Sequence, residues 1–381
     1  REASTPYHRL VAELFLLPAL ARRNVGLPVD DQYIARLRKM ARFTDTATQP
    51  DGNIPLWGDA DDGRALPLGT QDLNDHRYLV ETIDMIGNPG ASPKHDETLW
   101  WLGVGNARAE DAPRPASAEF KDAGVYIMRG PAAHVFIDAG PVGMGGRGGH
   151  GHNDCLSFTA AIDGCTLVVD PGCYIYTADY DARNWFRSTG AHNTPAVDGA
   201  EINRFNPKLL WRLSNDAVPT IRHWSTSDDI DLLVASHSGY QRLSTPVTPV
   251  RGYMLERSTN RLFVADGFEG EGEHDVQVPY TFAPDTALTN VAPGLWHMSK
   301  SGQHFSLVVS TPDDWAANIG ETPYSAGYGV SETVATLTFS RSGPLTPLAV
   351  AMMPERALPP DPVRWLGKVV AGRFPVPGFK S

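Results

Sequence analysis

Residues 148–173 read GGHGHNDCLSFTAAIDGCTLVVDPGC, and this stretch decides the fold of the larger part of the chain. It contains two short apolar runs, Leu156–Ile162 and Thr166–Val169, separated by the pair Asp163-Gly164. An Asp-Gly pair between two such runs is a strong signal for a two-residue type I′ turn, because both of its residues need a positive φ. The stretch therefore predicts an antiparallel β-hairpin that returns the chain to its starting point.

Short extended runs of the same kind recur along the chain after residue 115. They are Val125–Met128, Val135–Ile137, Leu232–Ala235, Arg261–Ala265, Val276–Phe282, Phe305–Val309, Thr333–Phe339 and Ala349–Met352. The chain has 36 Gly and 31 Pro among 381 residues, a share above the average of about 12%, which indicates many turns. Many short strands joined by turns predict a large antiparallel β-sandwich over residues 116–381. The Pro-rich tail from Leu358 is expected to be irregular.

The first 115 residues show the periodicity of helices instead. Apolar residues recur at helical spacing from Tyr7 to Phe15, with Thr5 as the expected N-cap, Pro6 at the first helical position, and Pro18 expected to kink or end the helix. Further helices are expected to begin at Asp30, Asp75 and Ser92-Pro93. Residues 51–69 predict a long loop and residues 106–117 a linker. The expected fold class is therefore α+β with two domains, at residues 1–115 and 116–381.

Composition excludes several classes of function. The formal net charge is −11 and the pI is about 5.5, whereas nucleic-acid binders and membrane-surface proteins need a basic face. The longest apolar run, residues 10–21, contains a Glu and a Pro and is shorter than the roughly 18 residues of a membrane span. Cys155, Cys165 and Cys173 form no C-x-x-C pair and are expected to be buried and free. We expect no nucleic-acid partner and no membrane span.

The histidines of the opening stretch predict a metal site. His150 and His152 are two residues apart, so on an extended chain they point to the same face. Asp170 ends the returning strand of the hairpin and can lie beside His152, and His192 follows 22 residues later. Two imidazoles and one carboxylate are a common zinc ligand set. Taken separately, these residues have ordinary structural readings, as a hydrogen-bonded histidine pair and as a turn residue before Pro171.

An iron site is the alternative. His152-Asn153-Asp154 is also an H-x-D motif, the start of a two-histidine, one-carboxylate iron site, with His192 as the third ligand. Arg204, 12 residues further on, would then hold a keto-acid. This reading needs Asp154 as the ligand, whereas the zinc reading needs Asp170. A cupin would need a Glu shortly after the H-x-H, and residues 155–161 contain none.

Three motifs resemble one family. GHGHNDCLSF at 149–158, VVDPGCY at 168–174 and FRSTGAHNTPAVDG at 186–199 are similar to the heparinase II/III-like family of polysaccharide lyases, which includes heparin and alginate lyases and members encoded among exopolysaccharide genes. YHRLVAEL at 7–14 resembles the last helices of the family's α/α-toroid. The resemblance implies the C-terminal part of such a toroid followed by a large antiparallel β-sandwich, with the site between them. With so few helices before residue 115, the N-terminal part of the helical domain is expected to be missing.

The resemblance also implies roles for individual residues. His152, Asp170 and His192 would hold a zinc ion that is mainly structural. His150 would face the substrate and neutralise a uronate carboxylate. Tyr7 would be the base, and also the acid, of β-elimination. A tyrosine used as a base needs a lowered pKa, which we expect neighbouring cations to supply.

Cations are also expected to bind the substrate, because the enolate-like charge that develops in β-elimination must be stabilised. Arg147 and Arg187 are the nearby candidates for these substrate-binding residues. The expected activity is that of a carbon–oxygen lyase acting on an anionic polysaccharide or oligosaccharide, in the periplasm or outside the cell. The alternative is a non-catalytic glycan-binding or exopolysaccharide-assembly protein on the same scaffold.

Overall fold

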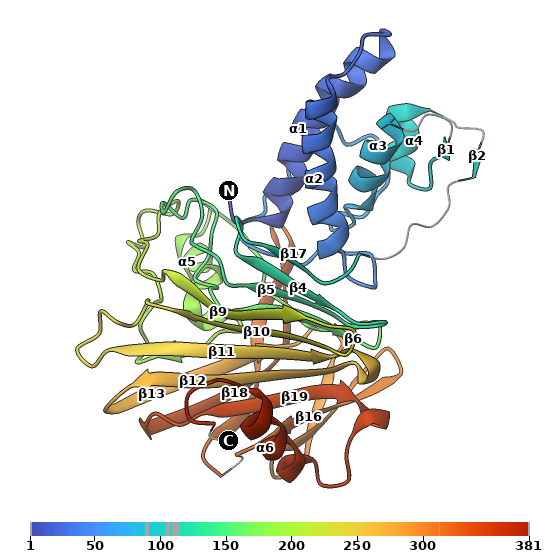
Figure 1. The fold of residues 1–381 in the computed structure, drawn as a ribbon. Helices are drawn as coiled ribbons and strands as arrows, with labels where there is room; N and C mark the ends of the chain where they lie inside the picture. The colour runs from blue at the N-terminus through green and yellow to red at the C-terminus, as the bar shows by residue number, and fades with distance from the viewer. Residues whose placement is uncertain (1, 88–90, 104–106, 109–114, 312, 380–381) are drawn as a thin grey trace.

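The computed structural model describes residues 2–87, 91–103, 107–108, 115–311 and 313–379. A group of helices stands at one end of a larger body of stacked β-sheets (Figure 1). The helices are α1 (Thr5–Asn24), α2 (Asp31–Ala47), α3 (Arg77–Gly87), α4 (Asp96–Leu102), α5 (Tyr180–Phe186) and α6 (Pro362–Arg373), with 3-10 turns η1 (Thr189–Ala191), η2 (Arg257–Thr259) and η3 (Glu355–Ala357). The predicted fold class, α+β with large antiparallel sheets after a helical part, is confirmed. Most of the predicted linker at 106–117 lies outside the described residues, so the domain boundary stays a prediction.

The ends of the first helices follow from their caps. Helix α1 begins one residue earlier than expected, because the Ser4 side chain accepts the Tyr7 N–H at 3.0 Å and so acts as the N-cap. Pro18 does not end this helix, which continues to Asn24; buried residues on either side of the proline pack it against the other helices. Asp30 caps α2 as predicted, by accepting the Tyr33 N–H at 3.0 Å.

The loop between α2 and α3 ties the helices together. Residues 48–76 form no helix or strand, as predicted for 51–69, and all of them are described. Arg64 of this loop pairs with Glu13 of α1 at 3.3 Å and with Glu97 of α4 at 2.7 Å. Both carboxylates are fully buried, where an unpaired charge would be costly. The loop is therefore part of the helical core and has a fixed path.

Three sheets carry the β-part. The eight-stranded sheet has the order β14 (Ala287–Ala292), β15 (Leu295–Lys300), β16 (Gln303–Val309), β19 (Leu348–Pro354), β12 (Arg261–Gly270), β11 (Val247–Glu256), β10 (Ile230–His237), β9 (Pro219–Thr226). The five-stranded sheet has the order β3 (Ala118–Phe120), β4 (Val125–Arg129), β5 (His134–Asp138), β6 (Phe158–Ile162), β7 (Cys165–Val168). The four-stranded sheet has the order β17 (Ala316–Gly327), β18 (Val330–Pro344), β13 (Glu273–Thr281), β8 (Ala196–Val197), and β1 (Ala91–Ser92) pairs with β2 (Ala107–Arg108).

The hairpin predicted around Asp163-Gly164 is formed by β6 and β7. Ile162 pairs with Cys165 across the turn, and Asp163 and Gly164 have φ values of 55° and 81°. Two positive φ angles are what a type I′ turn requires, so the predicted hairpin is confirmed. Its apolar side chains join one large core shared by the three sheets.

A buried arginine links several segments at the centre of the sandwich. Arg251 on β11 makes two hydrogen bonds to the Asp266 carboxylate, at 2.6 and 2.9 Å, and a third to the Leu156 carbonyl at 2.9 Å. It also donates to the carbonyl of Asn193. The guanidinium is fully buried, and the adjacent carboxylate outweighs burial and raises its pKa. Arg251 therefore fastens the segments at 156 and 193, which flank the metal candidates, to the large sheet.

The end of the chain differs from expectation. The tail was predicted to be irregular, yet residues 362–373 form helix α6. The proline content misled the prediction: Pro362 occupies the start of the helix, where a proline is favourable. Leu366 and Val370, four residues apart, are buried in a second apolar cluster with Val308 and Met353 of the large sheet (Figure 1). Packing against this sheet explains why the segment is helical.

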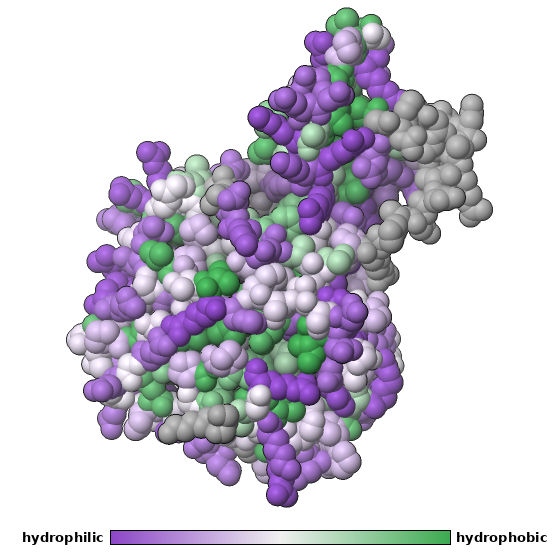
Figure 2. All heavy atoms as spheres, in the orientation of Figure 1, coloured by the Kyte–Doolittle hydropathy of each residue, from purple (hydrophilic) through white to green (hydrophobic). Residues whose placement is uncertain are grey.

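The face of the molecule drawn in Figure 2 is mostly polar among the described residues. Figure 2 shows hydrophilic side chains spread over both the helical part and the sheets, with apolar residues in small groups. Among the described helices, none has the combination of length and apolar character that crossing a membrane requires.

Replacing Arg251 with Met should destabilise the fold by about 3–5 kcal/mol, because Asp266 would keep a buried charge without its partner. Arg222→Met is the matched control, since Arg222 pairs with Glu269 on the same sheet but both are partly exposed; its cost should be about 0–1 kcal/mol. Urea unfolding of the three proteins measures both values. Equal losses in the two variants would contradict the central role of Arg251.

Candidate functional site

The candidate site lies where three segments meet: the start of α1, the loop at 48–76 and the glycine-rich loop at 139–157. Close backbone approach explains two of the glycines. A Cβ on Gly58 would lie 2.0 Å from the Ala3 carbonyl oxygen and 2.7 Å from that of His150. A Cβ on Gly151 would lie 2.3 Å from the Val142 carbonyl oxygen. A side chain at Gly58 would push the 48–76 loop away from the glycine-rich loop, and one at Gly151 would distort the glycine-rich loop itself.

The structure brings the three predicted metal ligands together. His152, Asp170 and His192 each offer a ligand atom, and these atoms lie within 4.8 Å of one another. The His192 Nδ1 lies 2.8 Å from the Asp170 Oδ2, and the rings of His152 and His192 are 5.3 Å apart between centroids. All three side chains are buried. They come from the glycine-rich loop, the end of β7 and the turn after η1, as the hairpin argument expected.

The chemistry of this cluster fits a metal ion. Within the described residues, the His152 Nδ1 and the His192 Nε2 are buried and have no hydrogen-bond partner. The other ring nitrogen of His152, Nε2, lies 2.9 Å from the Asp59 Oδ1. Histidine ligands of metals usually donate their second N–H to a carboxylate in this way, leaving the first nitrogen for the ion. The cluster is therefore suited to an ion bound by imidazole and carboxylate.

Asp154 lies outside this ligand group. Its side chain is buried, and burial raises its pKa, an effect that His192 and His152 partly offset. The neighbouring Asp138 has its pKa raised well above the usual range by burial and by Asp154. Two buried carboxyls side by side are suited to sharing a proton. The arrangement favours Asp170 over Asp154 as the ligand and so weakens the iron reading.

Arg204, the second residue that the iron reading needs, pairs at the surface with Asp216 at 2.9 Å. Its guanidinium is therefore already engaged by a carboxylate of the chain.

The sequence analysis missed the residue that connects the site, Asp59. This buried carboxylate accepts hydrogen bonds from His150 Nδ1 at 3.2 Å and from His152 Nε2 at 2.9 Å. It also pairs with Arg183 at 2.6 Å and accepts a longer bond from the Cys173 thiol. Burial alone would raise its pKa, but Arg183 and the two histidines outweigh burial and hold it well below the usual range. Residues 51–69 contain four aspartates, and nothing in the sequence singles this one out.

Tyr7 and His150 lie face to face in this site. Their rings stack with centroids 4.0 Å apart and planes 27° from parallel. The Tyr7 hydroxyl donates to the Asp61 carboxylate at 2.9 Å and lies 3.5 Å from the Tyr176 hydroxyl. The expected lowering of the Tyr7 pKa is wrong for the protein without substrate: burial raises it, and Asp61 adds to the effect. The neighbour of the hydroxyl is an anion, where the sequence analysis expected a cation.

Aromatic rings extend the site beyond these two residues. Trp211 packs edge-on against His150 at 5.8 Å and against Tyr176 at 4.7 Å, and it is 42% exposed. The Arg183 guanidinium lies 5.4 Å from the Tyr176 and the Trp211 ring centres, within cation–π range. Sequence reasoning missed Trp211, because a tryptophan in a loop carries no signal of its surroundings.

The two predicted substrate-binding arginines differ in accessibility. Arg147 is exposed at the rim of the glycine-rich loop. Arg187 is fully buried, and its three guanidinium nitrogens donate to Asn184 and to the carbonyls of residues 209, 210 and 212. Burial and the neighbouring Arg183 lower its pKa to about 10. This environment favours a structural role that shapes the Trp211 loop, so a direct substrate contact by Arg187 stays a prediction.

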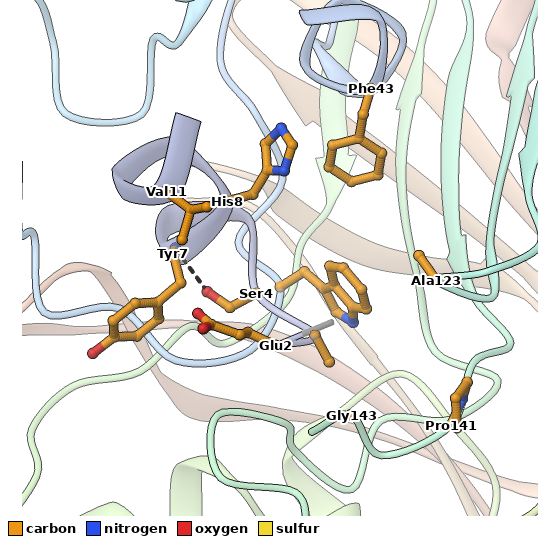
Figure 3. Close-up of a pocket in the computed structure, with 11 residues that line it drawn as sticks. Glu2, Ser4, Tyr7, His8, Val11, Phe43, Ala123, Pro141 and Gly143 are labelled. Carbon is orange, nitrogen blue, oxygen red and sulfur yellow. Dashed lines mark hydrogen bonds between the residues drawn. The ribbon is translucent and has the colours of Figure 1, made fainter. Parts of the chain in front are cut away.

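A cavity of about 300 Å³ opens on the other side of the start of α1. It is lined mainly by apolar groups, among them Phe43 and Trp57, and also by Ser4, Tyr7 and His8. Figure 3 shows the Tyr7 hydroxyl pointing away from Phe43 and His8. The Tyr7 hydroxyl therefore faces Asp61 and Tyr176, away from this cavity.

Comparison with known proteins defines the class. Residues 112–353 match the family described as heparinase II/III-like, C-terminal. The chain belongs to this heparinase II/III-like family. No curated protein matches the sequence.

Solved structures share the fold over nearly the whole chain. The heparan sulfate lyase HepC from Pedobacter heparinus is 18% identical with a TM-score of 0.71, and the match covers 93% of this chain and 52% of that one. A heparinase III gene product gives the same identity, TM-score and coverage. A third structure, described as heparinase III, is 15% identical with a TM-score of 0.67, covering 91% of this chain and 53% of that one. The chain thus spans about half the length of these structures, and at this identity the likeness is one of fold.

Asp59→Ala and Arg183→Ala should each destabilise the protein by about 3–5 kcal/mol, since each leaves a buried charge without its partner. The double variant should lose clearly less than the sum of the single losses, because paired residues couple by roughly 0.5–3 kcal/mol. Chemical denaturation at one fixed metal concentration measures the cycle. Strict additivity would show that the two residues do not act as a pair.

Proposed function

We propose that this chain is part of a polysaccharide lyase that cleaves an anionic, uronate-containing glycan by β-elimination. The main observation in support is the stacked pair of Tyr7 and His150, held at the junction of the helical part and the sandwich. Membership of the family supports a lyase. The polar groups around the pair, Asp61, Tyr176 and Asp59, suit proton transfer beside a substrate carboxylate. A polymeric glycan of this kind is met in the periplasm or outside the cell, where we place the protein.

His150 is suited to contact the substrate carboxylate. Its Nδ1–H donates to the Asp59 carboxylate, and this leaves Nε2 without a partner in that contact. A ring protonated on both nitrogens offers its Nε2–H to an anion. The ring is 21% exposed and so remains within reach of a ligand. A fixed donor aimed at the developing enolate charge stabilises the transition state without reorganisation.

Tyr7 is suited to move the proton. β-Elimination removes the proton α to the uronate carboxylate and protonates the leaving glycosidic oxygen. With its pKa raised, the Tyr7 hydroxyl is protonated in the free protein and can donate to the leaving oxygen. To act first as the base, it must pass its own proton on, and the Asp61 carboxylate at 2.9 Å is placed to accept it. Asp61 is therefore part of the proposed proton path.

Zinc is the ion that we propose for His152, Asp170 and His192. Two observations support this assignment. Among the described residues, His152 Nδ1 and His192 Nε2 have no hydrogen-bond partner, and the second nitrogen of His152 contacts the Asp59 carboxylate. Bound zinc would fix the glycine-rich loop against the end of the β6–β7 hairpin. His150 belongs to that loop and stacks on Tyr7, so the proposed role of the ion is structural.

Glycan binding without catalysis is the second candidate. Trp211 is 42% exposed and packs against Tyr176 and His150. An exposed aromatic ring beside a histidine suits sugar binding even if no bond is broken. Unsaturated uronate products absorb near-ultraviolet light. Incubation with uronate polymers therefore separates the two candidates, since a binding protein retains the polymer and produces no absorbance.

His192→Ala should lower the bound metal and the melting temperature together, because a metal that binds only the folded state stabilises it. Asp154→Asn is the matched control and should keep the metal, since Asp154 lies outside the ligand group. Elemental analysis and thermal unfolding measure both effects. One metal per chain in His192→Ala would refute the ligand set, and loss of metal in Asp154→Asn would restore the iron reading.

Tyr7→Phe should cut turnover by about 10²–10⁴, the usual contribution of a positioned acid or base, while the fold stays nearly intact. His150→Ala should weaken both substrate binding and turnover with zinc still bound. Tyr33→Phe is the control, since Tyr33 donates only to a backbone carbonyl on the neighbouring helix. Rates are measured in the full natural protein. Wild-type rates in Tyr7→Phe would remove Tyr7 from the mechanism and leave it as a packed aromatic.

A further inference from the structure

A second histidine cluster lies on the large sheet, outside the site described above. His297 on β15 pairs with Ser306, and His304 on β16 pairs with Ser299, so the two histidines are diagonal neighbours across the hairpin. Trp296 on β15 is buried in the core, and alternation along the strand therefore directs His297 to the opposite, outer face. Their rings meet there, with His297 Nε2 3.2 Å from His304 Nδ1.

A carboxylate from a third segment completes the group. Phe305 on β16 pairs with Pro354 at the end of β19, and η3 begins at the next residue, Glu355. The register therefore places Glu355 beside His304. The Glu355 carboxylate lies 3.6 Å from His297 Nδ1, and the three residues offer ligand atoms within 4.8 Å of one another.

We propose that His297, His304 and Glu355 form a second, solvent-accessible binding site for a divalent transition metal such as Zn²⁺. Imidazole and carboxylate are ligands that this class of ion accepts. With Zn–N distances of about 2.0–2.1 Å, two ligand atoms of a tetrahedral ion lie roughly 3.3 Å apart, close to the 3.2 Å between His297 Nε2 and His304 Nδ1. The group is partly exposed, His297 by 33% and Glu355 by 53%, so water can supply the remaining position.

An ion at this place would join separate segments of the chain. The β15–β16 hairpin supplies two ligands, and η3 supplies the third. After η3 the chain continues into α6, which packs on the outer face of the same sheet. Binding to the folded arrangement alone would stabilise it by linkage. The site is independent of the proposed lyase activity.

Zinc titration of the folded protein tests this site. His152, Asp170 and His192 stay unchanged in every variant. The protein is first passed over a chelating resin, and ZnCl₂ binding is then followed by isothermal titration calorimetry and thermal unfolding. The variants are His304→Asn and the milder Glu355→Gln. The control is His223→Asn, an exposed histidine of the same sheet whose Nε2 lies 2.8 Å from the Ser225 hydroxyl.

Wild type and His223→Asn should show a zinc-binding event that His304→Asn lacks or shows at least 10–100-fold more weakly. Loss of a residue that only hydrogen-bonds a metal ligand already weakens metal binding by about this factor. Glu355→Gln should be weakened in the same direction, and zinc should raise the melting temperature less in both variants than in wild type. Equal zinc binding in wild type, His304→Asn and Glu355→Gln would overturn the proposal. So would a wild-type protein that takes up no zinc beyond that held by His304→Asn.

Discussion

The buried carboxylate of Asp59 is the constraint on which the rest of the site depends. A carboxylate without solvent costs several kcal/mol unless cations and donors surround it, and here Arg183, His150 and His152 do so. Asp59 belongs to the loop that is packed into the helical core, whereas its three partners belong to the sandwich. The charge is satisfied only when the two parts dock in one arrangement, so docking and assembly of the site are the same event.

Docking in this way also fixes the distance between the groups proposed for chemistry. Tyr7 belongs to the helical part and His150 to the sandwich. Their rings stack because both side chains hydrogen-bond to the 58–61 segment. The Tyr7 hydroxyl bonds Asp61, and the His150 Nδ1 bonds Asp59. One short loop thus positions both members of the pair. The backbone contact between the Asp59 N–H and the His150 carbonyl, at 2.9 Å, holds that loop in register.

Sequence reasoning succeeded where the signal was local. The Asp163-Gly164 turn, the period-two strands and the Asp30 cap depend on neighbours a few residues away, and the approach of Asp170 to His152 follows from the hairpin that the turn creates. It failed where the partner lies far along the chain: Asp59 is 91 residues from His150 and 124 from Arg183. The same limit explains α6, whose helical form depends on an apolar sheet face, and the Tyr7 pKa, which depends on Asp61.

The two oxygens of Asp59 each contact one histidine of the H-x-H motif, and the two histidines differ in their surroundings. Oδ1 contacts His152 and Oδ2 contacts His150, so both rings lie on one side of the loop, as the i, i+2 spacing predicts. Burial then separates them: His152 is enclosed and leaves one nitrogen toward Asp170 and His192, whereas His150 keeps an exposed edge beside Tyr7. A change of charge at one ring must therefore be felt at the other through the carboxylate that they share. For this reason the proposed metal ligands and His150 act as one electrostatic unit.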